Sequence, residues 1–204
     1  MSNKVFNTIE EEEDTLTDIT FCLPVYNVSR YVSDCIDSIL SEIKGMNVEI
    51  ICIDDCSTDD SWEILNKICA HNNNCFCFKN NSNRGVSYTR NRALDLARGK
   101  YIWFIAPDDL LYPGVVKSFL ECAEREAADI ILGNYMKVEE SFSLRSDSLS
   151  QENSIVFAKT KEMILPSDNF GNKMCAVWSG MFRSSFLIDN KLLKLPTPIR
   201  CVEP

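Results

Sequence analysis

The sequence predicts an α/β fold in which a mostly parallel sheet carries helices on both faces. Two observations lead to this prediction. Short apolar runs such as 48–53 and 101–105 lack the alternation of half-exposed strands, which is typical of parallel strands covered on both sides. Segments with apolar residues at helical spacing, as at Val32, Ile36 and Ile39, separate these runs. Strand–helix alternation of this kind builds parallel sheets through right-handed crossovers.

The predicted elements follow one another in a regular order. The first strand contains Pro24, whose missing N–H requires the strand to end there or to leave that position unpaired. Gly45 and Gly99 each close a helical segment. The expected strands are 19–25, 48–53, 75–78, 101–105 and 129–135, and the expected helices are 31–43, 61–70, 86–97 and 114–127.

The chain divides into four regions by composition. Residues 1–17 form a polar tail, and its acidic run 10–14 is most simply solvated. Residues 18–135 form the α/β core, and 136–154 form a variable loop rich in Ser, Glu and Asp. Residues 155–204 form a further segment that we expect to be incomplete, since no recognisable final element closes it. Ordered stretches are expected there at 155–157, 159–165, 176–182 and 184–190.

Composition and charge exclude several function classes. The chain has 204 residues, 45% of them apolar, and a net charge of −9, which disfavours binding to nucleic acid. It has no run of about 20 apolar residues that could span a bilayer, and no apolar signal-peptide core. Ten cysteines accompany a single histidine, His71, without zinc-ligand spacing. We therefore expect reduced, structural thiols and a cytoplasmic location.

Polar groups follow three of the predicted parallel strands, where ligands bind in open α/β sheets. Carboxylates beside an aromatic ring and an arginine suit a nucleoside diphosphate held through a divalent cation. The alternative is that each group belongs to an ordinary turn. Asp59 and Asp60 are expected to be solvated acids of the following helix. The groups at the strand ends are Pro24, Val25, Tyr26 and Asn27, then Asp54 and Asp55, then Asp108 and Asp109, with Arg90 and Arg92 on the helix 86–97.

Four ordered segments carry a resemblance to glycosyltransferase family 2. They are PVYN at 24–27, IDDCSTDDS at 53–61, NRGVSYTRN at 83–91 and FIAPDD at 104–109. The resemblance is strong over residues 19–135 and weaker over 173–203. It implies a Rossmann-like GT-A fold, a UDP-linked nucleotide-sugar donor, inversion at the anomeric carbon, and Mn²⁺ or Mg²⁺ as cofactor. A glycan or lipid-linked glycan is the implied acceptor, and peripheral membrane association is compatible with it.

The resemblance also implies roles for residues on the donor side. Pro24, Val25 and Tyr26 would wall the base pocket. Asp55 would contact the nucleoside, with Asp54 beside it. Arg90 would approach the base or the diphosphate.

Further roles concern the metal and the acceptor. Asp108 would be the last acid of the metal motif, and Asp109 would face the substrate beside it. Trp178 lies in a stretch, 177–186, that resembles the acceptor-side segment. Glu203 stands where the family has its catalytic base.

Two departures from the family pattern keep a second function open. Ala106 stands where the family usually has an acid, and the chain ends one residue after Glu203, where the family continues. We expect an inverting glycosyltransferase. The alternative is a nucleotide-sugar-binding module with little or no turnover. A dehydrogenase-like domain is disfavoured, because no Gly-x-Gly-x-x-Gly follows the first strand.

Overall fold

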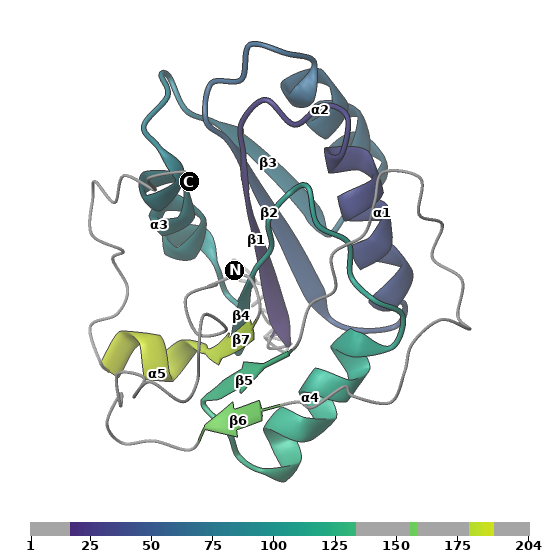
Figure 1. The fold of residues 1–204 in the computed structure, drawn as a ribbon, viewed down its shortest axis with the longest axis vertical. Coiled ribbons are helices and arrows are strands. Elements are labelled where there is room, and N and C mark those ends of the chain that lie inside the picture. Colours follow the sequence, from purple (N-terminus) through teal and green to yellow (C-terminus); the bar gives the residue numbers. More distant parts are fainter. Residues whose placement is uncertain (1–16, 134–155, 159–179, 190–204) are drawn as a thin grey trace, which may run out of the picture.

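The protein forms one twisted sheet between two helical layers (Figure 1). A computed structural model describes residues 17–133, 156–158 and 180–189. The strands are β1 Ile19–Val25, β2 Val48–Asp54, β3 Cys75–Lys79, β4 Tyr101–Phe104, β5 Ile130–Leu132, β6 Val156–Ala158 and β7 Gly180–Arg183. The helices are α1 Val32–Glu42, α2 Ser61–His71, α3 Val86–Leu96, α4 Val115–Arg125 and α5 Ser184–Asp189.

The predicted elements of the core are confirmed. Every expected strand and helix between residues 19 and 127 is present, with ends that differ by at most a few residues. The expected helix at 159–165 lies outside the described residues, as do residues 1–16 of the tail and the whole variable loop 136–154. No helix in the described ranges combines the length and the apolarity needed to cross a bilayer.

The sheet is parallel in one half and antiparallel in the other. Its strand order is β3-β2-β1-β4-β7-β5-β6. The first four strands pair in parallel, whereas β7 pairs antiparallel with both β4 and β5, and β6 pairs antiparallel with β5. The expected α/β class is therefore confirmed. The sequence did not indicate that β7 would separate β4 from β5.

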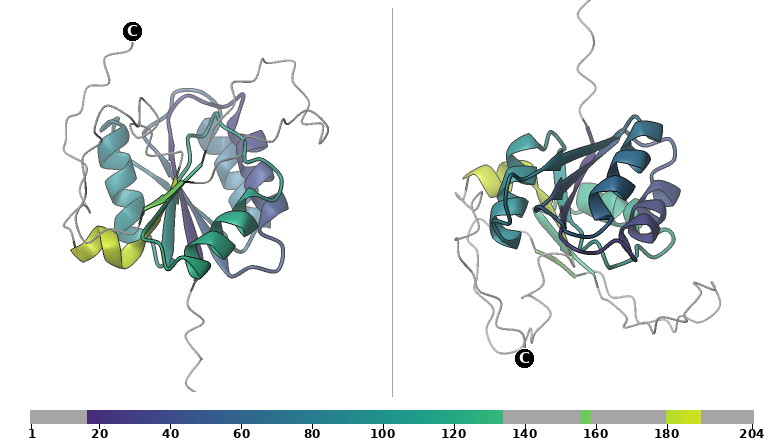
Figure 2. Two further views of the ribbon diagram at one scale, coloured as in Figure 1. Left: turned by 60° about the horizontal axis from the view of Figure 1, so that its bottom comes forward. Right: turned by 90° about the horizontal axis from the view of Figure 1, so that it is seen from above.

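Helices cover both faces of the sheet, as expected (Figure 2). Alternate side chains of β1, such as Phe21 and Leu23, pack with α1, α2 and α4, and the intervening Cys22 packs with α3 and α5. Each helix contributes an apolar stripe, for example Ile36 and Ile39 of α1, which are fully buried. Burial on both faces explains why the central strands read as continuous apolar runs.

Pro24 lies inside β1, and the register explains why it is tolerated. Along β1 the backbone groups alternate between the two neighbouring strands. The carbonyl of Cys22 accepts from Ile105 on the β4 side, whereas that of Val25 accepts from Asp55 on the β2 side. Pro24 shares the direction of Cys22, and the β4 pairing ends at Cys22 opposite Phe104. The missing N–H therefore faces no ladder partner.

A buried group of polar side chains connects the amino-terminal ends of the central strands. The carboxylate of Glu49 accepts from the Thr20 hydroxyl at 2.6 Å and from the Arg98 guanidinium at 2.8 Å. Thr20 in turn accepts from the N–H of Gly99 at 2.8 Å. A Cβ on Gly99 would lie 2.4 Å from the Thr20 backbone nitrogen, so only glycine allows this approach. These bonds connect β1, β2 and the segment before β4 at the amino-terminal ends of the strands.

Candidate functional site

The carboxyl ends of β1, β2 and β4 form one polar rim. Val25 pairs with Asp54 across β1 and β2, so the two strands end at the same level. Residues 105–109 continue from β4 at the same edge, beginning with the Ile105 N–H that donates to Cys22. The expectation that these three strand ends share a rim is confirmed.

Asp55 is the most heavily hydrogen-bonded acid of the rim. It is 3% exposed. Its Oδ1 accepts from Asn80 Nδ2 at 2.6 Å and from the N–H of Arg84 at 2.9 Å, and its Oδ2 accepts from the N–H of Gly85 at 2.7 Å. Gly85 has φ +84°, a left-handed conformation that glycine adopts without strain. Asp55 therefore holds the turn that leads into α3.

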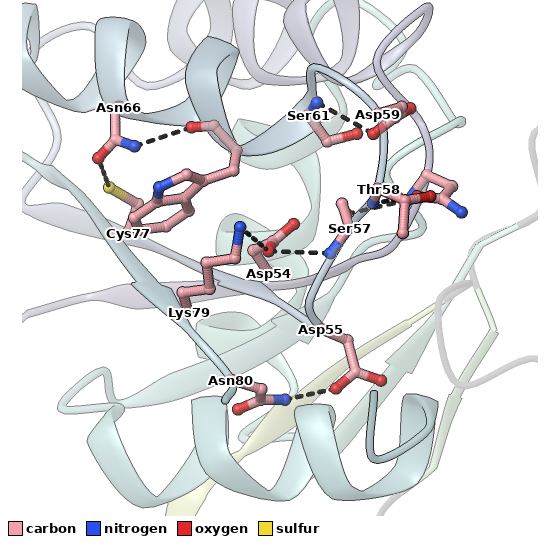
Figure 3. Close-up of polar contacts among 12 residues, drawn as sticks. Asp54, Asp55, Ser57, Thr58, Asp59, Ser61, Asn66, Cys77, Lys79 and Asn80 are labelled. Carbon is pink, nitrogen blue, oxygen red and sulfur yellow. Dashed lines mark hydrogen bonds and ion pairs between the residues drawn. The ribbon is translucent and has the colours of Figure 1, made fainter. Parts of the chain in front are cut away.

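Asp54 turns toward the other face of the sheet, so the two adjacent carboxylates have different neighbours (Figure 3). Its Oδ2 accepts from the N–H of Ser57 at 3.1 Å and lies 3.5 Å from Lys79 Nζ. Lys79 also lies 5.2 Å from the ring centroid of Trp62. Asp54 is completely buried, and its Oδ1 has no hydrogen-bond partner among the described residues. Its charge is balanced locally by a lysine.

Asp59 joins the loops that follow β1 and β2. Its Oδ2 accepts from the N–H of Ser29 at 2.9 Å, and its Oδ1 accepts from the N–H of Ser61 at 3.0 Å. Burial opposes ionisation of Asp59, but the hydrogen bonds from Ser61 and Ser29 outweigh it and lower its pKa to about 2. The expectation that Asp59 is a solvated acid like Asp60 is wrong, because the fold brings the first loop against it.

Further hydrogen bonds reinforce this junction. Asn27 Oδ1 accepts from the N–H of Thr58 at 2.8 Å, and the N–H of Asn27 donates to Ser57 Oγ at 3.1 Å. The N–H of Val28 donates to Ser61 Oγ at 3.0 Å. The serines and threonine of the acidic loop thus serve mainly to position the segment after β1. That segment includes Tyr26, whose side chain is 44% exposed on the rim.

The loop after β4 presents two adjacent carboxylates, Asp108 and Asp109, both exposed. Although Asp109 is exposed as a residue, partial burial of its carboxyl group raises its pKa to about 6, and repulsion from Asp108 adds to this shift. The loop is attached to α1, because the N–H of Leu111 donates to Ser38 Oγ at 3.0 Å. The Cys35 thiol lies near both acids, which contribute after burial to raising its pKa.

Arginines of α3 and its preceding turn complete the rim. Arg92 Nη1 donates to Asn80 Oδ1 at 2.6 Å. The Arg84 guanidinium stacks 4.5 Å from the centroid of Tyr88. Arg90, the arginine that the sequence selected, is half-buried on α3. Asn80 was not selected, because a loop asparagine carries no sequence signal for a contact with a strand end 25 residues earlier.

Of the remaining predicted site residues, the structure describes two and leaves two outside its described ranges. Pro24 and Val25 are buried at the end of β1, and Val25 packs in the core beside α1. Their roles, like that of Tyr26, stay predictions. Trp178 and Glu203 lie outside the described residues.

A divalent cation fits the chemistry of the loop after β4. In the described part of the chain, no group of three or more His, Cys, Asp or Glu side chains is arranged to hold a metal ion. Asp108 and Asp109 offer two carboxylates that repel each other, which a cation would relieve. Mg²⁺ and Mn²⁺ are commonly held by one or two carboxylates with phosphate oxygens and water. The residues therefore fit a cation that is shared with a diphosphate.

The fold and the rim together define an open α/β protein with acids at two strand ends, Asp54 and Asp55 at β2 and Asp108 and Asp109 after β4. The model of the family described as Glycosyl transferase family 2 matches residues 20–188, and the chain belongs to this family. The resemblance drawn from the sequence is thereby confirmed.

Two curated relatives illustrate this membership. Glycosyltransferase GlyG of Streptococcus pneumoniae serotype 4 (strain ATCC BAA-334 / TIGR4) is 29% identical over 60% of this chain and 40% of its own length. The Escherichia coli UDP-Glc:alpha-D-GlcNAc-diphosphoundecaprenol beta-1,3-glucosyltransferase WfaP is 34% identical over 61% of this chain and 48% of its own. The chain thus spans less than half the length of these curated relatives.

The solved structure of S. aureus TarS 1-349 has the same fold. It matches with a TM-score of 0.64 and 20% identity, covering 88% of this chain and 50% of the TarS 1-349 chain. The complex of the same protein with UDP-GlcNAc gives a TM-score of 0.63. At this identity the likeness supports the GT-A architecture alone.

Proposed function

We propose that this chain is the donor-binding part of an inverting glycosyltransferase that moves a sugar from a nucleotide-sugar donor to a glycan acceptor. The observation that carries the proposal is the shared rim, where Asp55 at the end of β2 and Asp108 and Asp109 after β4 lie on one edge of the sheet. Family membership and the name of WfaP, which includes UDP-Glc, support a UDP-linked donor. The name of WfaP supports a lipid-linked glycan as acceptor.

The nucleoside would occupy the part of the rim between β1 and β2. The exposed ring of Tyr26 offers a surface for stacking, and Asp55 offers an acceptor for a base N–H. Pro24 and Val25 would form a wall of this pocket, and Asp54 would lie next to Asp55 at its base. Arg90 would approach the base or the diphosphate from α3.

The diphosphate would lie toward the loop after β4. Asp108 and Asp109 would hold Mn²⁺ or Mg²⁺, which when bound supplies positive charge to the leaving diphosphate. The attachment of this loop to α1 through Ser38 keeps the two carboxylates at the rim. Glu203 is our candidate for the base that deprotonates the acceptor hydroxyl, and Trp178 is our candidate for an acceptor contact.

A nucleotide-sugar-binding module with little turnover is the second candidate. It is favoured by Ala106, which supplies no carboxylate at a position where the family usually has one. Transfer of label from a nucleotide sugar to acceptor glycans distinguishes the enzyme from the module.

The eight cysteines in the described residues are free thiols, which supports the proposed cytoplasmic location.

Calorimetry with UDP tests the proposed site. We expect UDP to bind at least tenfold more tightly with Mn²⁺ than with a chelator, and Asp108→Asn to remove that difference. Asp95→Asn, an exposed change near the far end of α3, is the matched control and should bind like the unmodified protein. Equal UDP affinity with Mn²⁺ and with chelator would rule out the metal role of Asp108.

A further inference from the structure

We propose that Asn80, held by Arg92, is a positioning residue that orients the Asp55 carboxylate and thereby makes the site prefer uridine over cytidine nucleotides. The inference rests on the proposed nucleotide site. It concerns Asn80, which the sequence did not select, and Arg92, which the sequence placed among the polar groups near the strand ends. Three hydrogen bonds form its basis, one from Asn80 to Asp55 and two from Arg92.

The Asn80 side chain is fixed at both ends of its amide. Its Nδ2 donates to Asp55 Oδ1 at 2.6 Å and to Thr89 Oγ1 at 3.3 Å, and its Oδ1 accepts from Arg92 Nη1 at 2.6 Å. Arginine can only donate and an ionised carboxylate can only accept. The amide therefore has one orientation that satisfies both partners. Asn80 is 5% exposed, so water competes little with these bonds.

Arg92 is itself anchored to the end of β3. The same Nη1 donates to the carbonyl of Lys79 at 2.8 Å, and the guanidinium lies 5.8 Å from the ring centroid of Phe78. The backbone N–H of Asn80 donates to the carbonyl of Asp54 at 2.8 Å, which extends the β2–β3 pairing. The end of β3 thus determines where the Asn80 amide points.

The Asp55 carboxylate keeps capacity for one more donor. A carboxylate has about four acceptor positions, and the bonds from Asn80, Arg84 and Gly85 use three, two on Oδ1 and one on Oδ2. Since Asn80 and Arg84 occupy Oδ1, the remaining position belongs to Oδ2. This gives an acceptor of fixed direction at the end of β2.

A fixed acceptor distinguishes pyrimidine bases by one proton. Uracil carries an N–H at ring position 3 and can donate to Oδ2, whereas neutral cytosine carries a lone pair there. Cytosine would place two acceptors against each other and leave the remaining Oδ2 position of Asp55 without a donor. A site that is built to hydrogen-bond one group rejects an analogue without it more strongly than an apolar pocket rejects a small change. Loss of the Asn80 bond would leave the carboxylate held only by the N–H groups of Arg84 and Gly85, which loosens its orientation and weakens this selection.

Calorimetry of UDP and CDP with Asn80→Ala, Arg92→Met and Asn66→Ala tests the inference. We expect the unmodified protein to prefer UDP, and Asn80→Ala to reduce the ratio of UDP to CDP affinity about tenfold. Arg92→Met keeps the apolar stem and should reduce the ratio less, because Asp55 still attracts the amide N–H₂. Asn66→Ala is the control, since Asn66 is exposed on α2 and bonds to the carbonyl of Trp62.

Each outcome separates the inference from the proposed function. If no nucleotide binds to the unmodified protein, the proposed function itself fails. If UDP binds and CDP binds equally well, or if Asn80→Ala weakens both nucleotides by the same factor, the site stands and the positioning role is overturned. Thermal unfolding of each variant is measured in parallel. If Asn80→Ala does not fold, the reduced ratio expected for Arg92→Met decides the question.

Discussion

Replacing Asp59 with alanine removes the side chain that joins the loops after β1 and β2. Two backbone N–H groups, those of Ser29 and Ser61, donate to its two oxygens at 2.9 and 3.0 Å. Loss of the Asp59 carboxylate leaves the start of α2 without a side-chain acceptor, because Asp60 at the N-cap makes no side-chain capping bond. We expect Asp59→Ala to lower the free energy of unfolding and Asp60→Ala to leave it almost unchanged.

The magnitude follows from the number and exposure of the bonds. A hydrogen bond contributes about 1 kcal/mol net, and loss of a helix-capping acceptor costs about 0.5–2 kcal/mol. Because both N–H groups are partly exposed, water can replace the lost acceptor in part. We therefore expect a loss of about 1–2 kcal/mol for Asp59→Ala. Asp59→Asn should not restore it fully, because its amide has one oxygen for two donors.

Urea unfolding followed by tryptophan fluorescence measures the effect, since Trp62 and Trp103 are packed against the core. The same series gives a pH signature. Asp59 has a pKa of about 2, below its ordinary 3.8, so its contribution is complete above about pH 4 and is lost as the pH falls toward 2. The difference between the unmodified protein and Asp59→Ala should shrink over that window.

The comparison with Asp60→Ala decides the matter. Asp60 is exposed and its side chain makes no capping hydrogen bond, so its replacement should change stability by no more than about 0.5 kcal/mol. Equal stability of the two alanine variants, or a difference that does not change between pH 5 and pH 2, would refute the role of Asp59 in joining the loops.

Two further predictions concern the rim. Cys56 has φ +64°, a conformation that costs other residues more than glycine. In urea unfolding we therefore expect Cys56→Gly to raise the free energy of unfolding by up to about 1 kcal/mol, and Cys56→Val to lower it. A lower free energy of unfolding for Cys56→Gly would contradict this reasoning. The pKa of Asp109 is raised to about 6, and a proton there competes with a cation, so Mn²⁺-dependent UDP affinity should fall as the pH drops below 6. Calorimetry across pH 5–7.5 tests this, and the fall should be smaller in Asp109→Asn.

The local sequence was sufficient to predict most of the core elements. Periodicity and apolar runs indicate a helix or a strand from neighbouring residues alone, so elements such as α1 and β2 were placed nearly to the residue. The position of Asp55 at a strand end followed from the same pattern. The parallel crossovers then predicted that three strand ends would share one rim.

Contacts between distant segments were decided by the tertiary structure. The insertion of β7 between β4 and β5 joins strands that are far apart in the chain, and nothing in their composition specifies that pairing. Asp59 appeared equivalent to Asp60 until the fold brought Ser29 within 2.9 Å.

The sequence by itself determined the α/β class, the order of the core elements and the acids at the strand ends, because these depend on short-range periodicity and on general rules of strand connection. Only the tertiary structure decided how each acid is used. Asp54 faces Lys79, whereas Asp55 faces Asn80, which is held by Arg92. Hydrogen-bond partners depend on the direction of side chains from separate elements, and that direction is fixed only when those elements pack.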